Sequence, residues 1–304
     1  MSPHTAVADY LTVRRALGFK LADHEWMLAD FASYLEQAGA NTITTELALA
    51  WASRTQGTES WKAARLSVVR GFARYLATID PATEIPPTGV LISRKRHAIP
   101  YLYSEAEIGR LLDAAAALRP HMRGATYHTV LGLLAVSGMR ISEALNLDRD
   151  DVDLSAGLLS VYNTKFGKSR QLPLHQSTVK ALARYEQRRD EAYPKPKTPG
   201  FFLSARASRL SKVTVQHTFR DLRQSAGLEG TRGSPRLHDF RHSFAVASLL
   251  DWHRTGVDVQ ARMLWLSTYM GHIEPSSTYW YLTAAPELMA LAAGRLENTL
   301  GDLP

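Results

Sequence analysis

The sequence predicts a mainly α-helical protein of two domains with one small antiparallel β-sheet. Its 304 residues exceed the usual size of a single hydrophobic core, so two domains are expected. Apolar residues recur at helical spacing along most of the chain, and the period changes only between residues 151 and 174. The prolines Pro81, Pro86 and Pro87 separate a first helical part from the remainder.

Residues 1–88 are predicted to form an N-terminal domain that is helical throughout. Thr44 or Thr45 can cap a short helix, and a longer helix begins near Thr58. The longer helix has four basic residues outside its apolar stripe, namely Lys62, Arg65, Arg70 and Arg74. These residues form either a solvated face or a set of phosphate contacts, and the pattern alone favours neither.

Residues 89–100 are predicted to be a basic interdomain linker because they are short and show no periodicity. Their charges include Arg94, Lys95 and Arg96. A linker that crosses a DNA groove would need such charges, and a merely solvated linker would tolerate them.

Residues 101–304 are predicted to form the second domain, with a C-terminal tail from about residue 283. Ser104 and Glu107 form a capping-box pattern that opens its first helix. Strands are expected around Leu158–Tyr162 and Gln171–Leu174, which would form a hairpin. Further helices are expected at 127–136, after 138, and at 176–190, 212–226, 239–254 and 258–270.

Composition narrows the functional classes. A formal net charge of +7 suits a polyanionic partner. The absence of cysteine excludes disulfides, thiolate catalysis and cysteine-ligated metals. No signal peptide and no apolar run long enough for a membrane span are evident, so we expect a cytoplasmic protein without a membrane partner.

The first candidate motif is Ser137-Gly138-Met139-Arg140, where a glycine turn meets the start of a helix. Backbone N–H groups and the Arg140 guanidinium would converge there and suit an oxyanion. Glu143 follows three residues later and could orient that arginine. The alternative is a surface salt bridge.

The second candidate motif is His238-Asp239-Phe240-Arg241, at the start of another helix. His238 and Arg241 are three residues apart and share one helical face. His242 projects about 100° away from Arg241, and we therefore interpret it as a structural residue.

The remaining candidates are Lys165, His272 and Tyr281. Lys165 lies in the predicted hairpin turn and is either solvated or a mobile general acid. Gly271-His272 ends a helix, and Tyr281 follows nine residues after His272. Tyr281 could instead be a core tyrosine, and Tyr279 is a second phenol close to it.

In order and residue type, these motifs resemble the tyrosine recombinase, or phage-integrase-like, family. Its pattern runs from Gly-x-Arg-x-x-Glu through a hairpin lysine, His-x-x-Arg and Gly-His to a tyrosine nine residues later. The resemblance covers essentially the whole chain. It implies that Arg140 and Arg241 hold the scissile phosphate, and that His238 and His272 hydrogen-bond to it and aid proton transfer. It also implies that Lys165 protonates the 5′ oxygen, that Tyr281 attacks, and that Glu143 supports the site. The hairpin departs from the commoner Gly-Lys-Gly pattern, which leaves Lys168 as an alternative to Lys165.

The resemblance also implies a fold and a reaction. A SAM-like N-terminal core-binding domain and an α+β catalytic domain would form a C-shaped clamp on duplex DNA. The reaction would pass through a 3′-phosphotyrosyl intermediate without metal, ATP or another cofactor. Phosphate contacts would come from Lys62, Arg65, Arg70, Arg74, Arg94, Lys95, Arg96 and Lys168.

The implied partner is double-stranded DNA with inverted-repeat core sites, and partner recombinases are an open alternative. The chain would be a monomer or dimer when free and a tetramer on paired sites. Its tail would dock either on its own domain or on a neighbouring protomer.

Two other functions share these features. A type IB topoisomerase would use the same chemistry to relax supercoils, and a DNA-binding regulator would keep the fold without the chemistry. The chain begins almost directly at the core-binding helices, which leaves no room for a separate arm-binding domain. This favours a simple integrase or transposase of a mobile element.

Overall fold

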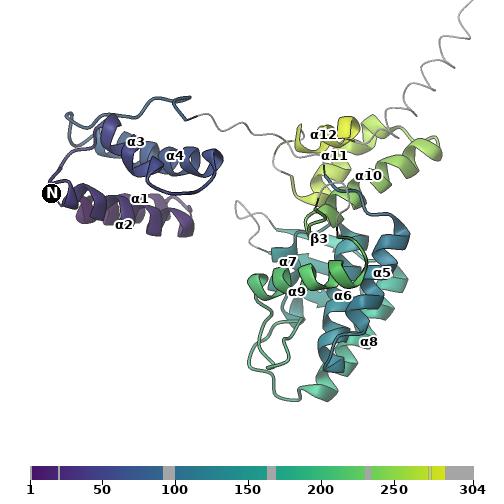
Figure 1. Cartoon of the computed structure of the whole chain (residues 1–304). Coiled ribbons are helices and arrows are strands. Elements are labelled where there is room, and N and C mark those ends of the chain that lie inside the picture. The colour runs from purple at the N-terminus through teal and green to yellow at the C-terminus, as the bar shows by residue number, and fades with distance from the viewer. Residues whose placement is uncertain are drawn as a thin grey trace, which may run out of the picture. The chain divides into compact units, whose positions relative to one another are not determined.

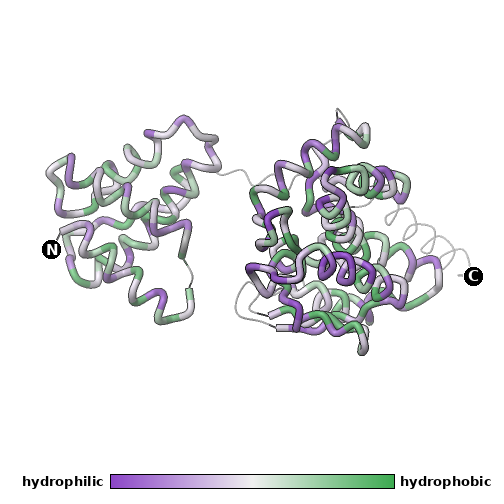
Figure 2. Tube along the Cα trace, turned by 90° about the horizontal axis from the view of Figure 1, so that it is seen from below, coloured by the Kyte–Doolittle hydropathy of each residue, from purple (hydrophilic) through white to green (hydrophobic). Residues whose placement is uncertain are grey.

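The computed structural model describes residues 2–19, 21–91, 100–162, 169–229, 234–272, 274 and 276–284. The chain divides into two compact units, with the division between Ala98 and Ile99. Hydrophobic and hydrophilic residues alternate along the helices of both units, as expected for helices with one buried face (Figure 2). The predicted boundaries of the linker remain predictions, because most of it, with Arg94, Lys95 and Arg96, lies outside the described residues.

Unit 1 is helical in its described residues, as predicted (Figure 1). Its helices are α1 (Pro3–Ala16), α2 (Ala22–Gln37), α3 (Thr45–Ser53) and α4 (Glu59–Leu76). Helix α1 packs against α2, and α3 packs against α4. Thr44 and Thr58 cap α3 and α4, each with its side chain accepting a hydrogen bond from a backbone N–H of the first turn.

Arg65 on α4 belongs to the core of unit 1, so the prediction that it lies on a polar face is wrong. Arg65 is only 7% exposed. The guanidinium stacks over the ring of Trp51 at 3.8 Å and donates to a carboxylate oxygen of Asp30 at 3.1 Å. The Nε1 of Trp51 donates to the same carboxylate oxygen at 2.9 Å. A cation tolerated in a core by these partners is not available to a phosphate.

The other basic residues of α4 remain at or near the surface. Lys62 pairs with Glu59 at 2.7 Å. Arg70 donates from Nε and Nη2 to the carbonyl oxygens of Pro86 and Pro87, at 2.7 and 2.8 Å. Arg74 is exposed.

Unit 2 is built around α6 (Figure 1). Its helices are α5 (Glu105–Ala116), α6 (His121–Ser137), α7 (Ile141–Asn146), η1 (Arg149–Asp151), α8 (Gln176–Ala192), α9 (Lys212–Ser225), α10 (Asp239–Arg254), α11 (Val259–Met270) and α12 (Ser276–Ala284). Helix α6 contacts α5, α7, α8 and α10. The predicted capping box of Ser104 and Glu107 is present at the start of α5.

A three-stranded antiparallel sheet interrupts the helices, in the order β1-β2-β3. The strands are β1 (Val152–Asp153), β2 (Leu158–Val161) and β3 (Arg170–Pro173). Leu159 pairs with Leu172, and both side chains are fully buried, which fixes the register. The predicted hairpin of β2 and β3 is confirmed, and the two-residue strand β1 was not predicted.

The core of unit 2 has two hydrophobic clusters. The larger gathers α5, α6, α8, α9 and the sheet, with Tyr127, Phe201 and Phe240 among its buried side chains. The smaller joins α10, α11 and α12 and contains Met263, Met270 and Tyr281. The second cluster packs α11 and the Tyr281 region of α12 against the middle and later part of α10.

Candidate active site

The C-terminus of α11 binds three arginine side chains. Gly271 ends the helix in the left-handed conformation, with φ of 67°, which leaves the last carbonyl groups without helical partners. Each of three successive carbonyl oxygens accepts one guanidinium: Tyr269 from Arg170 Nε at 2.8 Å, Met270 from Arg241 Nη2 at 2.6 Å, and Gly271 from Arg140 Nη2 at 3.0 Å. The negative end of the helix dipole thus holds the arginines in one place.

A second helix end fixes Arg241. Gly138 ends α6 with φ of 57°, and a Cβ at this position would lie 2.4 Å from the ring of Phe244. Its carbonyl oxygen accepts from Arg241 Nη1 at 2.8 Å. Arg241 is therefore held between the ends of α6 and α11, and the residue is only 2% exposed. Burial, together with the charge of Arg140, lowers the pKa of Arg241 to about 10, so the guanidinium remains positive at neutral pH.

Glu143 is the carboxylate that orients two of these arginines. It accepts from Arg140 Nη1 at 2.7 Å and from Arg170 Nη2 at 2.8 Å, and its side chain is 5% exposed. Burial raises its pKa, but hydrogen bonds and the charge of Arg170, with further hydrogen bonds from Arg140, outweigh burial and hold the pKa below its usual value. The side chains of Arg140, Arg170 and Arg241 surround this one carboxylate, so the group carries a net positive charge.

The predicted role of Glu143 in orienting Arg140 agrees with this geometry. The predicted backbone oxyanion site does not, because the backbone N–H of Arg140 donates to Glu143 at 2.9 Å. The charge available to an anion therefore comes from side chains. Arg140 presents it outward, since its side chain is 25% exposed.

His238 and His272 lie within the field of these arginines. His238 occupies the position before the first residue of α10 and is exposed, yet desolvation by the surrounding chain and the charge of Arg241 lower its pKa. His272 has Nδ1 2.6 Å from Oγ1 of Thr278. Burial, then the charges of Arg241 and Arg140, lower the pKa of His272 to about 3. Both imidazoles are consequently neutral at pH 7 before any anion binds.

Tyr281 lies on α12 against the same group of side chains. The residue is 2% exposed, and its ring centroid is 6.2 Å from that of His272. Burial raises the pKa of Tyr281, and the charges of Arg241 and Arg140 oppose that rise. Tyr279, the other predicted phenol, is 48% exposed. The two tyrosines therefore differ sharply in their surroundings.

His242, interpreted from the sequence as a structural residue, contacts the phenol of Tyr281. Its Nδ1 lies 3.0 Å from the hydroxyl oxygen of Tyr281, and its ring contacts the ring of His238 edge-on at 4.8 Å between centroids. His238 precedes His242 by four residues, about one helical turn, which places the two rings side by side. Helix α12 occupies the space into which His242 projects, since α12 packs on α10 and Tyr281 lies on α12.

Arg170 was also missed by sequence reasoning, although a signal was present. It shares one face of β3 with Leu172, because alternate residues of a strand point to the same side. Leu172 is fully buried. A cation on the buried face of a strand needs an acidic or carbonyl partner, and here Glu143 and Tyr269 provide both.

Lys165 and Lys168 lie outside the described residues, and their assignments remain predictions. Among the described residues, no three histidine, aspartate or glutamate side chains gather as a metal site would require. Across the same ranges, no helix is both long and apolar enough to cross a lipid bilayer.

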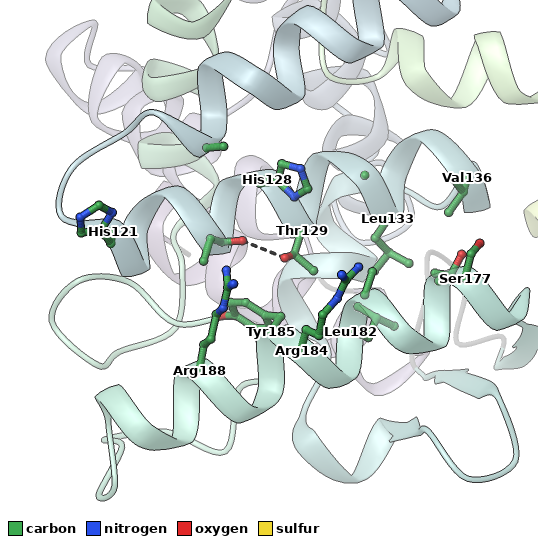
Figure 3. Close-up of a pocket in the computed structure, with 15 residues that line it drawn as sticks. His121, His128, Thr129, Leu133, Val136, Ser177, Leu182, Arg184, Tyr185 and Arg188 are labelled. Atoms are coloured by element: carbon green, nitrogen blue, oxygen red, sulfur yellow. Dashed lines mark hydrogen bonds between the residues drawn. The ribbon is translucent and has the colours of Figure 1, made fainter.

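A cavity of about 490 Å³ lies between α6 and α8. His121 and His128 from α6 and Arg184 and Arg188 from α8 line it (Figure 3). None of the predicted catalytic residues contributes to its walls, so this cavity is separate from the arginine cluster.

Comparison with known proteins agrees with the family resemblance. Residues 102–287 match the model of the phage integrase family. The chain is 45% identical to a putative integrase/recombinase, y4rB, of Sinorhizobium fredii, over 98% of both chains. It is 32% identical to tyrosine recombinase XerD of Mycobacterium tuberculosis, over 90% of both chains. Among solved structures, the integrase of transposon Tn1549 superposes with a TM-score of 0.68 at 17% identity, covering 98% of this chain and 99% of that one.

The match to the family model spans more than half of the chain, and the two relatives extend it across both units. The fold, mainly helical with a small antiparallel sheet, is that of the tyrosine recombinases. This chain belongs to the phage integrase family of tyrosine recombinases, enzymes that cleave and rejoin DNA strands in site-specific recombination.

Proposed function

We propose that this chain recombines DNA at specific core sites of a mobile element, with Tyr281 as the nucleophile. The observation that supports this assignment is the position of Tyr281, buried beside Arg140 and Arg241, while Tyr279 is exposed. A phenol in the field of two fixed guanidinium groups can attack a phosphate whose charge those groups neutralise.

The proposed cleavage step is a direct displacement at phosphorus. The Oη of Tyr281 forms a bond to the scissile phosphate as the bond to the 5′ oxygen breaks, which leaves a 3′-phosphotyrosyl ester. The proton of Oη passes to a neighbouring imidazole. The 5′ oxygen takes a proton from Lys165. Attack by a 5′ hydroxyl of a partner strand reverses these steps, and because the ester retains the bond energy, rejoining requires no ATP.

Arg140 and Arg241 have different roles in the proposed cleavage step. Arg241 is buried and held by two helix ends, so it supplies a fixed charge. Arg140 is partly exposed and reaches the surface where a phosphate could enter. Fixed charges of this kind stabilise the extra negative charge of the phosphorane without reorganising.

His238 and His272 complete the proposed phosphate site. Both are neutral before DNA binds, because desolvation by the surrounding chain and the neighbouring arginines lower their pKa. A neutral imidazole can donate a hydrogen bond to a phosphate oxygen from its protonated nitrogen. The negative phosphate would raise both pKa values and so strengthen that donation.

DNA contacts outside this site are proposed on α4. Arg74 is exposed, and Lys62 and Arg70 are partly exposed with partners that a phosphate could replace or supplement. Arg94, Lys95, Arg96 and Lys168 remain in the proposed set. Arg65 is excluded, because its guanidinium is buried against Trp51 and Asp30. The similar Tn1549 integrase was solved in complex with transposon right end DNA.

A nicked substrate that carries the end sequence of the element tests the proposal. Cleavage releases the short strand beyond the nick, so the covalent adduct cannot be religated and survives SDS. We expect an adduct with the wild-type chain and with Tyr279→Phe, and none with Tyr281→Phe. An adduct that survives Tyr281→Phe but is lost in Tyr279→Phe would reverse the assignment.

A further inference from the structure

The hydroxyl of Tyr281 is held by one imidazole. Its oxygen lies 3.0 Å from Nδ1 of His242, whereas His272 uses its Nδ1 to contact Thr278 at 2.6 Å. His238 lies one helical turn before His242 and contacts the ring of His242. Of the three histidines at the site, His242 is thus the one whose hydrogen bond to the phenol is formed before DNA binds.

Three rings fix the orientation of His242. Its ring centroid lies 4.8 Å from His238, 5.5 Å from Tyr281 and 5.8 Å from Trp280. The packing of α12 on α10 brings the last two rings into place. An imidazole that is held on several sides keeps its Nδ1 directed at the phenol, which is the geometry a proton transfer requires.

The protonation states fit a phenol that donates and an imidazole that accepts. Burial, then the charge of His238, lower the pKa of His242 to about 4. Burial raises the pKa of Tyr281. At pH 7 the imidazole is therefore neutral and the phenol is protonated, so the shared proton resides on the phenol oxygen. The charged and titratable groups that face His242 are Arg236, His238, Asp239, Arg241, His272 and Tyr281.

We propose that His242 is a catalytic residue, the general base that accepts the proton of Tyr281 during strand cleavage. The inference rests on the proposed function of Tyr281. As the Oη–P bond forms, the proton of Oη moves to Nδ1 of His242, and the P–O5′ bond breaks with protonation of O5′ by Lys165. In the rejoining step the proton returns from His242 to the leaving phenol.

The timing of this proton transfer explains how an imidazole with a low pKa can act as the general base. The phenol oxygen becomes far more acidic as its electron pair enters the bond to phosphorus, so the proton has to leave only in the transition state. The incoming phosphate also brings negative charge near His242, which raises the affinity of the imidazole for a proton.

The test compares single-turnover cleavage of the nicked substrate by wild-type protein and by His242→Asn, between pH 6.5 and 8.5. The amide oxygen of asparagine can accept the phenol hydrogen bond but cannot take the proton. We expect a rate about 100-fold lower at pH 7, typical of the loss of a general base. We also expect the variant's rate to rise about tenfold per pH unit, because the phenolate must then form before attack, while the wild-type rate stays nearly flat.

Two further experiments distinguish the role of His242 from the roles of His238 and Lys165. His238→Asn should lower the rate by a factor that is the same at every pH. A substrate with sulfur at the bridging 5′ position has a leaving group that needs no proton, so it should restore cleavage by Lys165→Ala but not by His242→Asn.

A measurement on the wild-type protein covers the case in which the variant does not fold. Nitrogen NMR of the His242 imidazole should show a proton on Nε2 and none on Nδ1 at pH 7. A protonated Nδ1 would overturn the inference, as would a pH-independent loss of rate in His242→Asn or a pH slope in His238→Asn. If the wild-type protein forms no adduct, the proposed function itself fails and the inference with it.

Discussion

Arg140 donates a hydrogen bond from Nη2 to the carbonyl oxygen of Gly271, 131 residues further along the chain, at 3.0 Å. This bond joins two motifs whose relation in sequence is only their order. It also explains a glycine at position 271, because a left-handed residue ends α11 and frees the carbonyl that Arg140 uses. Because of this left-handed conformation, substitution of Gly271 should affect both the fold and the placement of Arg140.

Gly271→Ala should reduce both stability and cleavage. The φ of 67° strains any residue with a Cβ, and the new methyl carbon would lie 2.8 Å from Nη1 of Arg170. We expect a loss of about 1–2 kcal/mol in the free energy of unfolding from the backbone alone, measured in urea. We also expect slower cleavage, because Arg170 must move away from Glu143.

Gly227→Ala is the matched control for that variant. Gly227 has nearly the same φ, 66°, but nothing lies within 4 Å of the added Cβ. It should lose a similar amount of stability and keep its cleavage rate. Equal cleavage rates in the two variants would contradict a role for the Gly271 backbone in placing the arginines.

Glu143→Gln should destabilise unit 2 by about 3 kcal/mol at pH 7, since it removes the buried partner of two guanidinium groups. The pKa of Glu143 is lowered in the folded state, so the carboxylate stabilises the fold above its unfolded pKa, and that contribution is lost as the pH falls through the folded value. The difference between wild type and variant should therefore shrink below about pH 4.

Urea denaturation across pH measures this difference. Glu191→Gln provides a control, because Glu191 is an exposed carboxylate on α8 that accepts a hydrogen bond from Gln187. Its effect should be within about 0.5 kcal/mol. A pH-independent effect of Glu143→Gln would mean that its contribution is packing rather than charge.

His242 and His272 should make the fold less stable in mild acid. Their pKa values are lowered to about 4 and about 3 in the folded state. Between these values and the unfolded pKa, the unfolded chain therefore binds more protons than the folded chain. Their contribution is complete above the unfolded pKa of about 6.5 and is lost progressively as the pH falls toward these values. Thermal melting between pH 7 and 4.5 should show a smaller decline for His272→Gln than for wild type.

Arg74→Ala should weaken DNA binding without unfolding unit 1. Loss of one phosphate contact lowers the salt dependence of the affinity by about one unit of log K against log salt. Fluorescence anisotropy at several salt concentrations measures the slope. Arg65→Ala should instead lower the urea midpoint of unit 1, because it removes the partner of Asp30 and Trp51.

Recombination distinguishes this protein from an enzyme that only relaxes supercoils. We expect exchange between two cloned copies of its site, with a tetramer on the paired sites and a monomer or dimer in their absence. Sedimentation with and without DNA measures the assembly. Relaxation of plasmids that lack the site, at an equal rate and without exchange, would favour the topoisomerase function.

Much of the fold follows from local sequence. Ser104 with Glu107, Thr44 and Thr58 each start a helix as predicted, because capping depends on a few adjacent residues. Strand β1 was missed because two residues are too few to show a period.

The site was harder to predict because its contacts are long-range. The order of Arg140, Arg241 and His272 was sufficient for the family resemblance, but no spacing indicates that Arg170 binds Glu143. His242 depends on the path of α12, and helical geometry alone placed it away from Arg241. The predicted position of Arg65 was wrong for a similar reason, because its partners come from α2 and α3.

The arrangement at the end of α11 also has a consequence for synthesis on the ribosome. The three carbonyl groups that order Arg140, Arg170 and Arg241 belong to residues 269–271, which are translated after all three arginines. A nascent chain that ends before α11 has the arginines but lacks the groups that order them. It also lacks Tyr281. With the proposed roles of the arginines and of Tyr281, the ability to cut DNA therefore arises only after α11 and α12 have been translated.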